Sequence, residues 1–254
     1  MKQNNKPLVS ILMNCHNGEK FLVESLKSVL SQTYKNWELV FWDNKSNDKS
    51  KKIFKKFKDK RFKYFYSKKF NTLYKSRELA LRGCKGDYIS FLDTDDVWLP
   101  KKLEYQIKLI LTKKYDFIYT NFYLQNKNRI IAYEELPEGN ITSKLMQHYN
   151  IAILTVIFKK NILKKYNLKF SSKYNVIGDF DLFIKLSQKM YFGCIQKPLA
   201  MYRDHIDSFS NRNSSMHIKE LSDWYEENYK LFTFIDKLNF KLSFYKAKLK
   251  SFIN

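Results

Sequence analysis

The chain has 254 residues, of which 44% are hydrophobic and 17% aromatic, enough to exclude wholesale disorder and to build one large core. Its 47 lysine and arginine residues outnumber 25 acidic ones, and the net charge of +22 predicts attraction to polyanions: nucleotide phosphates, nucleic acid or an anionic membrane face. Three distant cysteines, Cys15, Cys84 and Cys194, exclude a disulfide framework or a zinc pattern and favour a reduced cytosol. We expect neither a signal peptide nor a bilayer-spanning segment.

The first hundred residues alternate between apolar runs of strand length and stretches of helical periodicity. This alternation predicts an α/β fold, with a parallel sheet, helices on both faces and all strand-end loops at one edge. Ligands of such sheets bind at the carboxyl ends of the strands. The polar loops at residues 14–17, 43–48 and 93–96 should therefore converge on one cleft. The expected strands are residues 8–13, 38–43, 62–66 and 88–92, and the expected helices are residues 21–30, 53–57 and 71–81.

Past Pro100 the pattern is less regular, and strands and helices no longer alternate. Residues from 216 onward are expected to be helical, and a soft boundary is expected near residue 212. The expected strands are residues 117–124 and 129–133, joined by a polar turn at 125–128, then residues 151–158 and 191–202. The expected helices are residues 103–111 and 141–149 and a segment that begins at Asp179.

Three carboxylates follow the fourth expected strand, in the run Asp93-Thr94-Asp95-Asp96. Such a cluster at the end of a buried strand is costly unless positive charge lies among its members. Lysine or arginine would serve, and the Asp-x-Asp spacing also suits a divalent cation that neutralises a diphosphate leaving group. A helix cap would explain one of these acids but not all three. The cluster therefore favours a functional site.

Asp43 and Asp179 are the other candidate acids. Asp43 closes an apolar strand, where it suits either a hydrogen bond from a base or ribose, or an Asx-turn or helix cap. Asp179 begins a helical pattern, where the helix dipole stabilises its charged form. It is a candidate general base, although capping is the default interpretation for an acid at this position. With Asp181 nearby, one acid can cap while the other acts.

Arg203 and His205 lie in a polar loop after the last expected strand, where they could hold phosphate or substrate hydroxyls. The alternative is surface pairing with Asp204 or Asp207. His16 follows a buried strand and suits a packed loop position better than a ligand position. His148 and His217 suggest no role, and such isolated histidines make a zinc site unexpected.

The stretch from Lys49 to Lys69 holds eleven basic residues and one acid, interleaved with aromatic side chains. This composition suits nucleic-acid binding. The interpretation that we favour places the aromatic side chains in the core beneath a solvated basic face, so no nucleic-acid partner is expected.

A second basic segment lies at the C-terminus, with five lysines and no acid from Lys237 to Asn254. Apolar residues recur there at helical spacing, which suits an interfacial helix on anionic lipid. A helix packed on its own domain or on a second copy fits equally well, so the oligomeric state stays open. The stripe consists of Leu238, Leu242, Tyr245, Leu249 and Phe252.

Taken together, five stretches from about residue 7 to residue 210 resemble the family 2 glycosyltransferases in order and spacing. They are PLVSILMNCHN at 7–17, LKSVLSQTY at 26–34, WELVFWDNKSND at 37–48, GDYISFLDTDD at 86–96 and GDFDL at 178–182.

The resemblance implies a GT-A fold with a Rossmann-like, mostly parallel sheet over residues 1–212. Residues up to about 98 would bind the nucleotide-sugar, residues 99–212 the acceptor, and residues 213–254 would form a helical C-terminal extension. It implies inverting, metal-dependent transfer from a nucleotide-diphosphate sugar, with UDP-sugar expected, Mn²⁺ or Mg²⁺ as cofactor, and a glycan or lipid-linked oligosaccharide hydroxyl as acceptor. Bacterial surface polysaccharide synthesis would then be the setting, in the cytoplasm or peripherally on the inner face of the cytoplasmic membrane.

The resemblance also implies roles for individual residues. Asn14, His16, Asp43 and Arg77 would contact the base and ribose, and Asp93 with Thr94 the ribose and sugar. Asp95 would bind the metal, and Asp179 would be the catalytic base. The positions implied near the diphosphate or acceptor are Asp96, which would also orient its loop, Trp98, Arg203 and His205.

Two positions depart from the family pattern. Gly178 stands where an acid is usual, and Glu78 where asparagine is frequent. The Gln-x-x-Arg-Trp segment and membrane helices of processive members are missing, which favours single-sugar addition. Two alternatives stay open: a nucleic-acid-binding protein that uses residues 49–69, and a nucleotidyltransferase of similar fold that consumes NTP and releases pyrophosphate.

Overall fold

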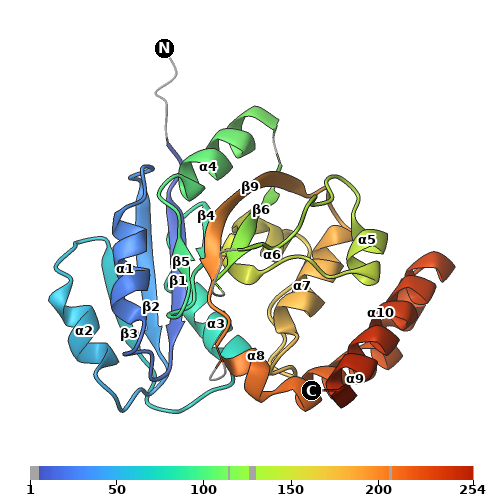
Figure 1. The fold of residues 1–254 in the computed structure, drawn as a ribbon. Helices are drawn as coiled ribbons and strands as arrows, with labels where there is room; N and C mark the ends of the chain where they lie inside the picture. Colours follow the sequence, from blue (N-terminus) through green and yellow to red (C-terminus); the bar gives the residue numbers. More distant parts are fainter. Residues whose placement is uncertain (1–5, 114, 126–129, 206–207, 254) are drawn as a thin grey trace.

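The structure, a computed structural model, describes residues 6–113, 115–125, 130–205 and 208–253. These residues form one nine-stranded sheet in the order β3-β2-β1-β4-β8-β6-β9-β5, with β7 paired to β6 (Figure 1). The strands are β1 (Val9–Cys15), β2 (Trp37–Asp43), β3 (Phe62–Tyr66), β4 (Tyr88–Phe91), β5 (Val97–Trp98), β6 (Phe117–Leu124), β7 (Ile130–Ile131), β8 (Ile157–Lys159) and β9 (Gly193–Tyr202).

The first four strands are parallel, with β1 between β2 and β4. Further along the sheet, β8 runs antiparallel to β4 and β6, and β5 runs antiparallel to β9. The predicted α/β fold with a mostly parallel sheet is thus confirmed. In the register Cys15 pairs with Asp43 and Leu12 with Phe91, so the loops that leave β1, β2 and β4 emerge at the same edge.

Two of the longer helices, α1 and α4, each bury an apolar side and expose a polar side, as their sequence periodicity predicts. Leu22, Leu26 and Val29 face the core from α1, and Leu103, Ile107 and Ile110 do so from α4. The α-helices are α1 (Leu22–Leu30), α2 (Ser50–Lys56), α3 (Leu73–Leu81), α4 (Lys102–Lys113), α5 (Thr142–Gln147), α6 (Asn161–Lys165), α7 (Gly178–Ser187), α8 (Phe209–Arg212), α9 (Ser214–Asn228) and α10 (Phe234–Ile253).

The strand predicted at residues 151–158 is largely wrong. Only Ile157–Lys159 is a strand, and the 3₁₀ turn η1 (Ile153–Thr155) precedes it. The hydrogen bond of this turn is local, since the Thr155 N–H donates to the Ala152 carbonyl at 2.9 Å. The residues of this run are therefore apolar because they are buried, not because they pair in a strand. The predicted turn at 125–128 lies mostly outside the described residues.

The basic stretch at residues 49–69 folds into α2 and β3. Phe54 is buried and packs against Phe41 and Tyr64 with tilted rings, whose centroids lie 4.4 Å and 5.5 Å away. Phe65 and Tyr66 are exposed. Most of the aromatic side chains therefore belong to the core, as the interpretation that we favoured predicts.

The C-terminal segment is helical, as predicted, and consists of α9, the 3₁₀ turn η2 (Tyr229–Leu231) and α10. These helices lie at the opposite end of the molecule from α2 and β3 (Figure 1). Trp224 and Phe240 are buried in the same core cluster as Phe180 of α7. Among the described residues, no helix combines the length and the apolar character needed to cross a bilayer.

Candidate active site

The loop Asp93-Thr94-Asp95-Asp96 leaves β4 at the carboxyl edge of the sheet and leads directly into β5. Its backbone is anchored by the Ser25 hydroxyl of α1, which donates to the carbonyl oxygens of Thr94 at 2.8 Å and Asp96 at 2.5 Å. A side chain at Gly18 would meet the Thr94 Oγ1 at 2.8 Å. The loop after β1 and the acidic loop are therefore in direct contact.

Arg77 of α3 provides the positive charge that the acidic cluster requires. Its buried guanidinium donates from Nη2 to both carboxylate oxygens of Asp93, at 3.0 Å and 2.9 Å. The Arg77 guanidinium also lies 5.1 Å from the ring centroid of Tyr74, one turn earlier on α3. This pairing fixes Asp93 at the entrance to the loop.

Arg203 and His205 approach the same loop from the segment that follows β9. The Arg203 backbone N–H donates to Asp96 Oδ1 at 2.9 Å, and its Nε–H donates to the Asp95 carbonyl at 2.8 Å. His205 Nε2 lies 3.1 Å from Asp95 Oδ2. These contacts join two segments more than a hundred residues apart, and Asp96 serves in them as a buried brace.

The electrostatics of this loop favour a bound cation. Burial raises the pKa of Asp95, and the Asp93 charge raises it further, while the bond from His205 opposes the shift. Burial, followed by the charges of Asp95 and Asp93, raises the pKa of Asp96 well above its usual range. A divalent ion beside these carboxylates would relieve both effects.

Within the described part of the chain, no three histidine, cysteine or acidic side chains form a complete metal cage. The carboxylates of the acidic loop fit an Mg²⁺ or Mn²⁺ ion that is held by one or two of them, with phosphate oxygens and water as its remaining ligands. Asp95 fits the position of such a carboxylate.

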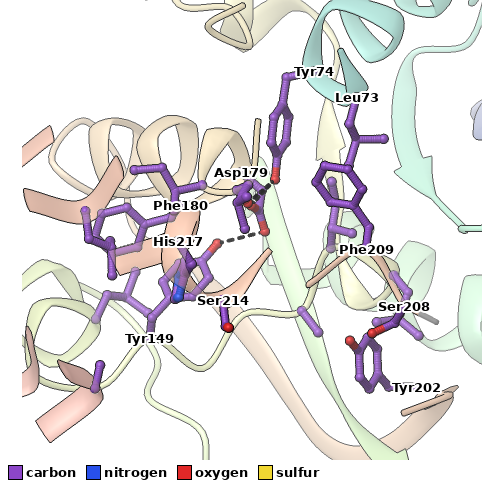
Figure 2. A pocket seen from close by; sticks show the side chains of 18 of the residues that line it. Leu73, Tyr74, Tyr149, Asp179, Phe180, Tyr202, Ser208, Phe209, Ser214 and His217 are labelled. Carbon is purple, nitrogen blue, oxygen red and sulfur yellow. Dashed lines mark hydrogen bonds between the residues drawn. The ribbon is translucent and has the colours of Figure 1, made fainter. Parts of the chain in front are cut away.

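Asp179 lies in the first turn of α7, with two tyrosine hydroxyls directed at its carboxylate (Figure 2). The Tyr74 hydroxyl donates to Oδ1 at 2.5 Å, and the Tyr149 hydroxyl donates to Oδ2 at 3.5 Å. Burial, together with the Asp179 charge, holds the pKa of both tyrosines well above the usual range. Both therefore remain hydrogen-bond donors that stabilise the carboxylate.

Helix capping does not explain Asp179. The N-cap position is Ile177 and makes no side-chain capping bond. Asp181, the second acid, is buried and binds the Trp224 Nε1–H at 2.8 Å and Lys185 Nζ at 2.5 Å. Asp181 is therefore a structural link from α7 to α9, and Asp179 is the acid directed at the cavity described below.

The tyrosine next to Asp179 also explains why glycine occupies position 178. A Cβ at Gly178 would lie 2.4 Å from Cγ of Tyr74, so the aromatic ring fills the space that a side chain would need. The ring of Tyr74 therefore occupies the space that the acid usual at position 178 would need.

One cavity of about 490 Å³ joins the acidic loop to Asp179. Its polar end is lined by Arg77, Asp93, Asp95 and Asp96. Away from these groups the lining is mostly apolar, with a few polar side chains such as His148 and His217, and it reaches α10. The apolar part is lined by Leu145, Met146, Phe180, Leu221, Phe240 and Phe244.

Seven of the predicted site residues do not line this cavity. Three of them, Thr94, Arg203 and His205, lie in the acidic loop or contact it, as described above. The other four lie elsewhere. Asn14 and Asp43 are buried at the ends of β1 and β2, and Asp43 accepts hydrogen bonds from the Ser46 N–H at 2.8 Å and the Tyr64 hydroxyl at 2.6 Å. His16 is exposed beside Phe70. Trp98 is buried, and its Nε1–H donates to the Leu154 carbonyl at 2.8 Å.

The sequence did not indicate several polar side chains that line the cavity, among them Tyr74, Tyr149, His148 and His217. The two histidines had suggested no role. Burial lowers the pKa of His217, against the opposing charge of Asp179. Only Tyr74 left a signal in the sequence, because it precedes Arg77 by three residues and so lies on the same helix side.

Glu220 of α9 holds the segment that precedes Asp179. Its carboxylate accepts the backbone N–H groups of Asn175 at 2.7 Å, Val176 at 2.9 Å and Ile177 at 3.2 Å. Glu220→Gln should lower the free energy of unfolding by about 1–3 kcal/mol, because buried N–H groups lose a charged acceptor. Urea denaturation measures this. Asp223→Asn, an exposed acid on the same helix, should change stability by less than about 0.5 kcal/mol; equal effects would contradict the role of Glu220.

Comparison with known proteins gives a consistent result. The family model described as Glycosyl transferase family 2 matches residues 10–186. WfgD of Escherichia coli, a UDP-Glc:alpha-D-GlcNAc-diphosphoundecaprenol beta-1,3-glucosyltransferase, is 35% identical over 65% of this chain and 66% of its own length. WfaP of the same species, which carries the same description, is 33% identical over 72% of this chain and 71% of its own length. The chain thus spans about two thirds of the length of these relatives.

Solved structures show the same fold at low identity. Staphylococcus aureus TarS 1–349, in complex with UDP-GlcNAc, has a TM-score of 0.71 and 17% identity over 85% of this chain and 66% of that one. The mannosyltransferase PcManGT from Pyrobaculum calidifontis, in complex with GDP-Man and Mn²⁺, has a TM-score of 0.64 and 14% identity over 88% of this chain and 65% of that one.

Proposed function

This chain belongs to glycosyl transferase family 2, and on that premise we propose that it transfers a hexose from a UDP-sugar to a hydroxyl of a lipid-linked glycan acceptor. The observation that carries the proposal is the single cavity in which the Arg77–Asp93 pair, Asp95 and Asp179 meet. An acidic loop suited to a cation–diphosphate pair and a separate carboxylate for a proton are the two parts that such a transfer needs.

The donor binds at the carboxyl edge of the sheet. The diphosphate lies beside Asp95, the sugar and ribose beside Asp93 and Thr94, and the base toward the ends of β1 and β2. Asn14 supports this placement, because both polar atoms of its buried side chain lack a hydrogen-bond partner among the residues that the structure describes. A nucleoside would supply those partners.

Mn²⁺ or Mg²⁺, when bound at Asp95, supplies positive charge that offsets the charge of the leaving diphosphate. Asp96 and Arg203 position Asp95 through the loop contacts described above. Arg77 holds Asp93 in place through its ion pair. The chain's own residues therefore fix the carboxylate geometry before the donor arrives.

Asp179 acts as the general base. Its carboxylate accepts the proton of the acceptor hydroxyl, whose oxygen forms a bond to the anomeric carbon as the bond from that carbon to the UDP oxygen breaks. This single displacement inverts the anomeric configuration. Tyr74 and Tyr149 donate hydrogen bonds to the carboxylate and hold it in the cavity (Figure 2).

Tyr74→Phe should reduce the turnover number about tenfold or more while leaving UDP affinity unchanged, because Asp179 loses the hydrogen bond that positions its carboxylate. Steady-state kinetics and titration with UDP measure the two quantities. Tyr34→Phe, which loses a hydroxyl bond to the Pro7 carbonyl away from the cavity, is the control; a turnover number unchanged by Tyr74→Phe would exclude the role of Tyr74.

The acceptor class rests on the chemistry of the cavity and on the relatives. WfgD and WfaP are described as acting on a sugar diphosphoundecaprenol. Beyond Asp179 the cavity lining is mostly apolar, which suits an acceptor that carries lipid better than a free oligosaccharide.

UDP release tests the proposal. With UDP-glucose, Mn²⁺ and an N-acetylglucosaminyl diphosphate linked to a polyprenol, UDP release should depend on the acceptor. Pyrophosphate release from an NTP, without acceptor-dependent UDP release, would indicate a nucleotidyltransferase and refute sugar transfer.

A further inference from the structure

Helix α10 has two apolar sides, and only one of them packs against the protein. Its inner side contains buried Phe240, which stacks on Tyr225 of α9 with ring centroids 4.7 Å apart. Asp236, the acid in its first turn, is buried there and accepts hydrogen bonds from the Thr233 N–H at 3.1 Å and from the Ser143 hydroxyl. The inner side therefore anchors α10 to the molecule.

The other apolar side is exposed. Six large side chains, which we call the outer strip, are 49–80% exposed. At about 100° of rotation per residue they fall within an arc of about 100° on the helix surface. Such an area on a soluble surface marks an interaction site. The outer strip consists of Phe234, Ile235, Leu238, Leu242, Tyr245 and Leu249.

Lysines border the outer strip on both sides. By the same rotation, Lys237 and Lys241 lie on one side of it and Lys246 on the other, and no acid lies on α10 after Asp236. Long lysine side chains beside an apolar strip let the strip enter the acyl region while the ammonium groups reach anionic headgroups. A protein partner would need a matching apolar groove bordered by acids, whereas an anionic lipid surface supplies both features.

The position of α10 relative to the cavity supports the same partner. Residues Ser243, Phe244 and Ala247, on the inner side of the helix, line the cavity that contains Asp179. One helix thus separates the outer strip from the apolar end of the cavity. A bilayer against the strip would place lipid one helix diameter, about 10–12 Å, from that end.

We propose that α10 is an in-plane interfacial helix that docks the protein on an anionic lipid bilayer through the outer strip. The reason for such docking rests on the proposed function, because a lipid-linked acceptor enters from that bilayer. The docking itself requires neither donor nor acceptor.

Co-sedimentation with vesicles tests the proposal in the absence of nucleotide and acceptor, so its outcome is independent of sugar transfer. The full chain should bind vesicles of phosphatidylglycerol and phosphatidylcholine more than about tenfold better than pure phosphatidylcholine at ~0.15 M salt. Leu242→Glu/Leu249→Glu should reduce that binding more than about tenfold. Lys241→Gln/Lys246→Gln should weaken it and flatten its salt dependence.

The matched control is Leu111→Glu/Tyr191→Glu, which introduces the same charge at side chains 61% and 68% exposed outside α10. It should bind anionic vesicles nearly as well as the original chain. Circular dichroism and sedimentation velocity of each variant verify folding and oligomeric state.

Three results would overturn the proposal. They are a failure of the original chain to bind anionic vesicles, equal losses in the two glutamate pairs, and a solution dimer that Leu242→Glu/Leu249→Glu dissociates. The last result would assign the outer strip to a second copy of the chain.

Discussion

Asp179→Asn is expected to reduce sugar transfer by about 10²–10⁴-fold while leaving the affinity for UDP unchanged. Asparagine keeps the size of the side chain and can still accept the Tyr74 hydroxyl at its oxygen, but it cannot take a proton from the acceptor. The loss should therefore appear in the turnover number. Transfer kinetics at saturating donor and calorimetric titration with UDP measure the two quantities separately.

Asp181→Asn is the matched control for that result, two residues along the same helix. Asp181 holds Trp224 and Lys185 and is buried, so its replacement should lower stability more than turnover per folded molecule. If Asp179→Asn turns over normally, another group is the base. If it loses UDP binding as well, Asp179 supports the donor site rather than the proton transfer.

Asp95→Asn is expected to weaken Mn²⁺-dependent binding of UDP by about 10–100-fold. Arg203 holds the Asp95 backbone carbonyl and His205 lies beside its carboxylate, while burial and the neighbouring Asp93 charge raise the pKa of Asp95, so a cation is its natural partner. Without a divalent ion, the effect of Asp95→Asn on UDP affinity should have the opposite sign. In EDTA the variant should bind UDP at least as tightly as the original chain, because one charge that repels the diphosphate is gone.

Titration of UDP with and without Mn²⁺ measures this pair of effects. Asp116→Asn removes an exposed carboxylate paired only loosely with Lys159, at 3.7 Å, and should change neither. A variant at Asp95 whose UDP affinity keeps its full dependence on Mn²⁺ would contradict the role of Asp95 as a metal ligand.

The polar end of the cavity could be predicted from sequence because it depends on local rules. A strand of apolar residues that ends in Asp93 and Asp95 must place those acids at the sheet edge, whichever helices follow. Arg77 could be matched by its position in the helix before β4. The loop contacts of Arg203 were harder to foresee, because they depend on β9 pairing with β5 across a hundred residues.

The apolar end could not be predicted, because it is assembled from elements distant in sequence. Tyr149 comes from the segment after α5, His217 from α9 and Phe240 from α10, and none follows a motif. The support from Glu220 to the loop before Asp179 is equally non-local. The outer strip was visible as a periodicity, but only the packing of Phe240 shows which side of α10 remains open.

Mass spectrometry of the lipid fraction, after incubation with UDP-glucose, Mn²⁺ and the polyprenol-linked acceptor, tests the central claim most directly. The acceptor should gain one hexose with the original chain, and Asp179→Asn should leave it unmodified under the same conditions. An acceptor whose mass stays unchanged across a panel of UDP-sugars, or one modified equally by Asp179→Asn, would contradict the account.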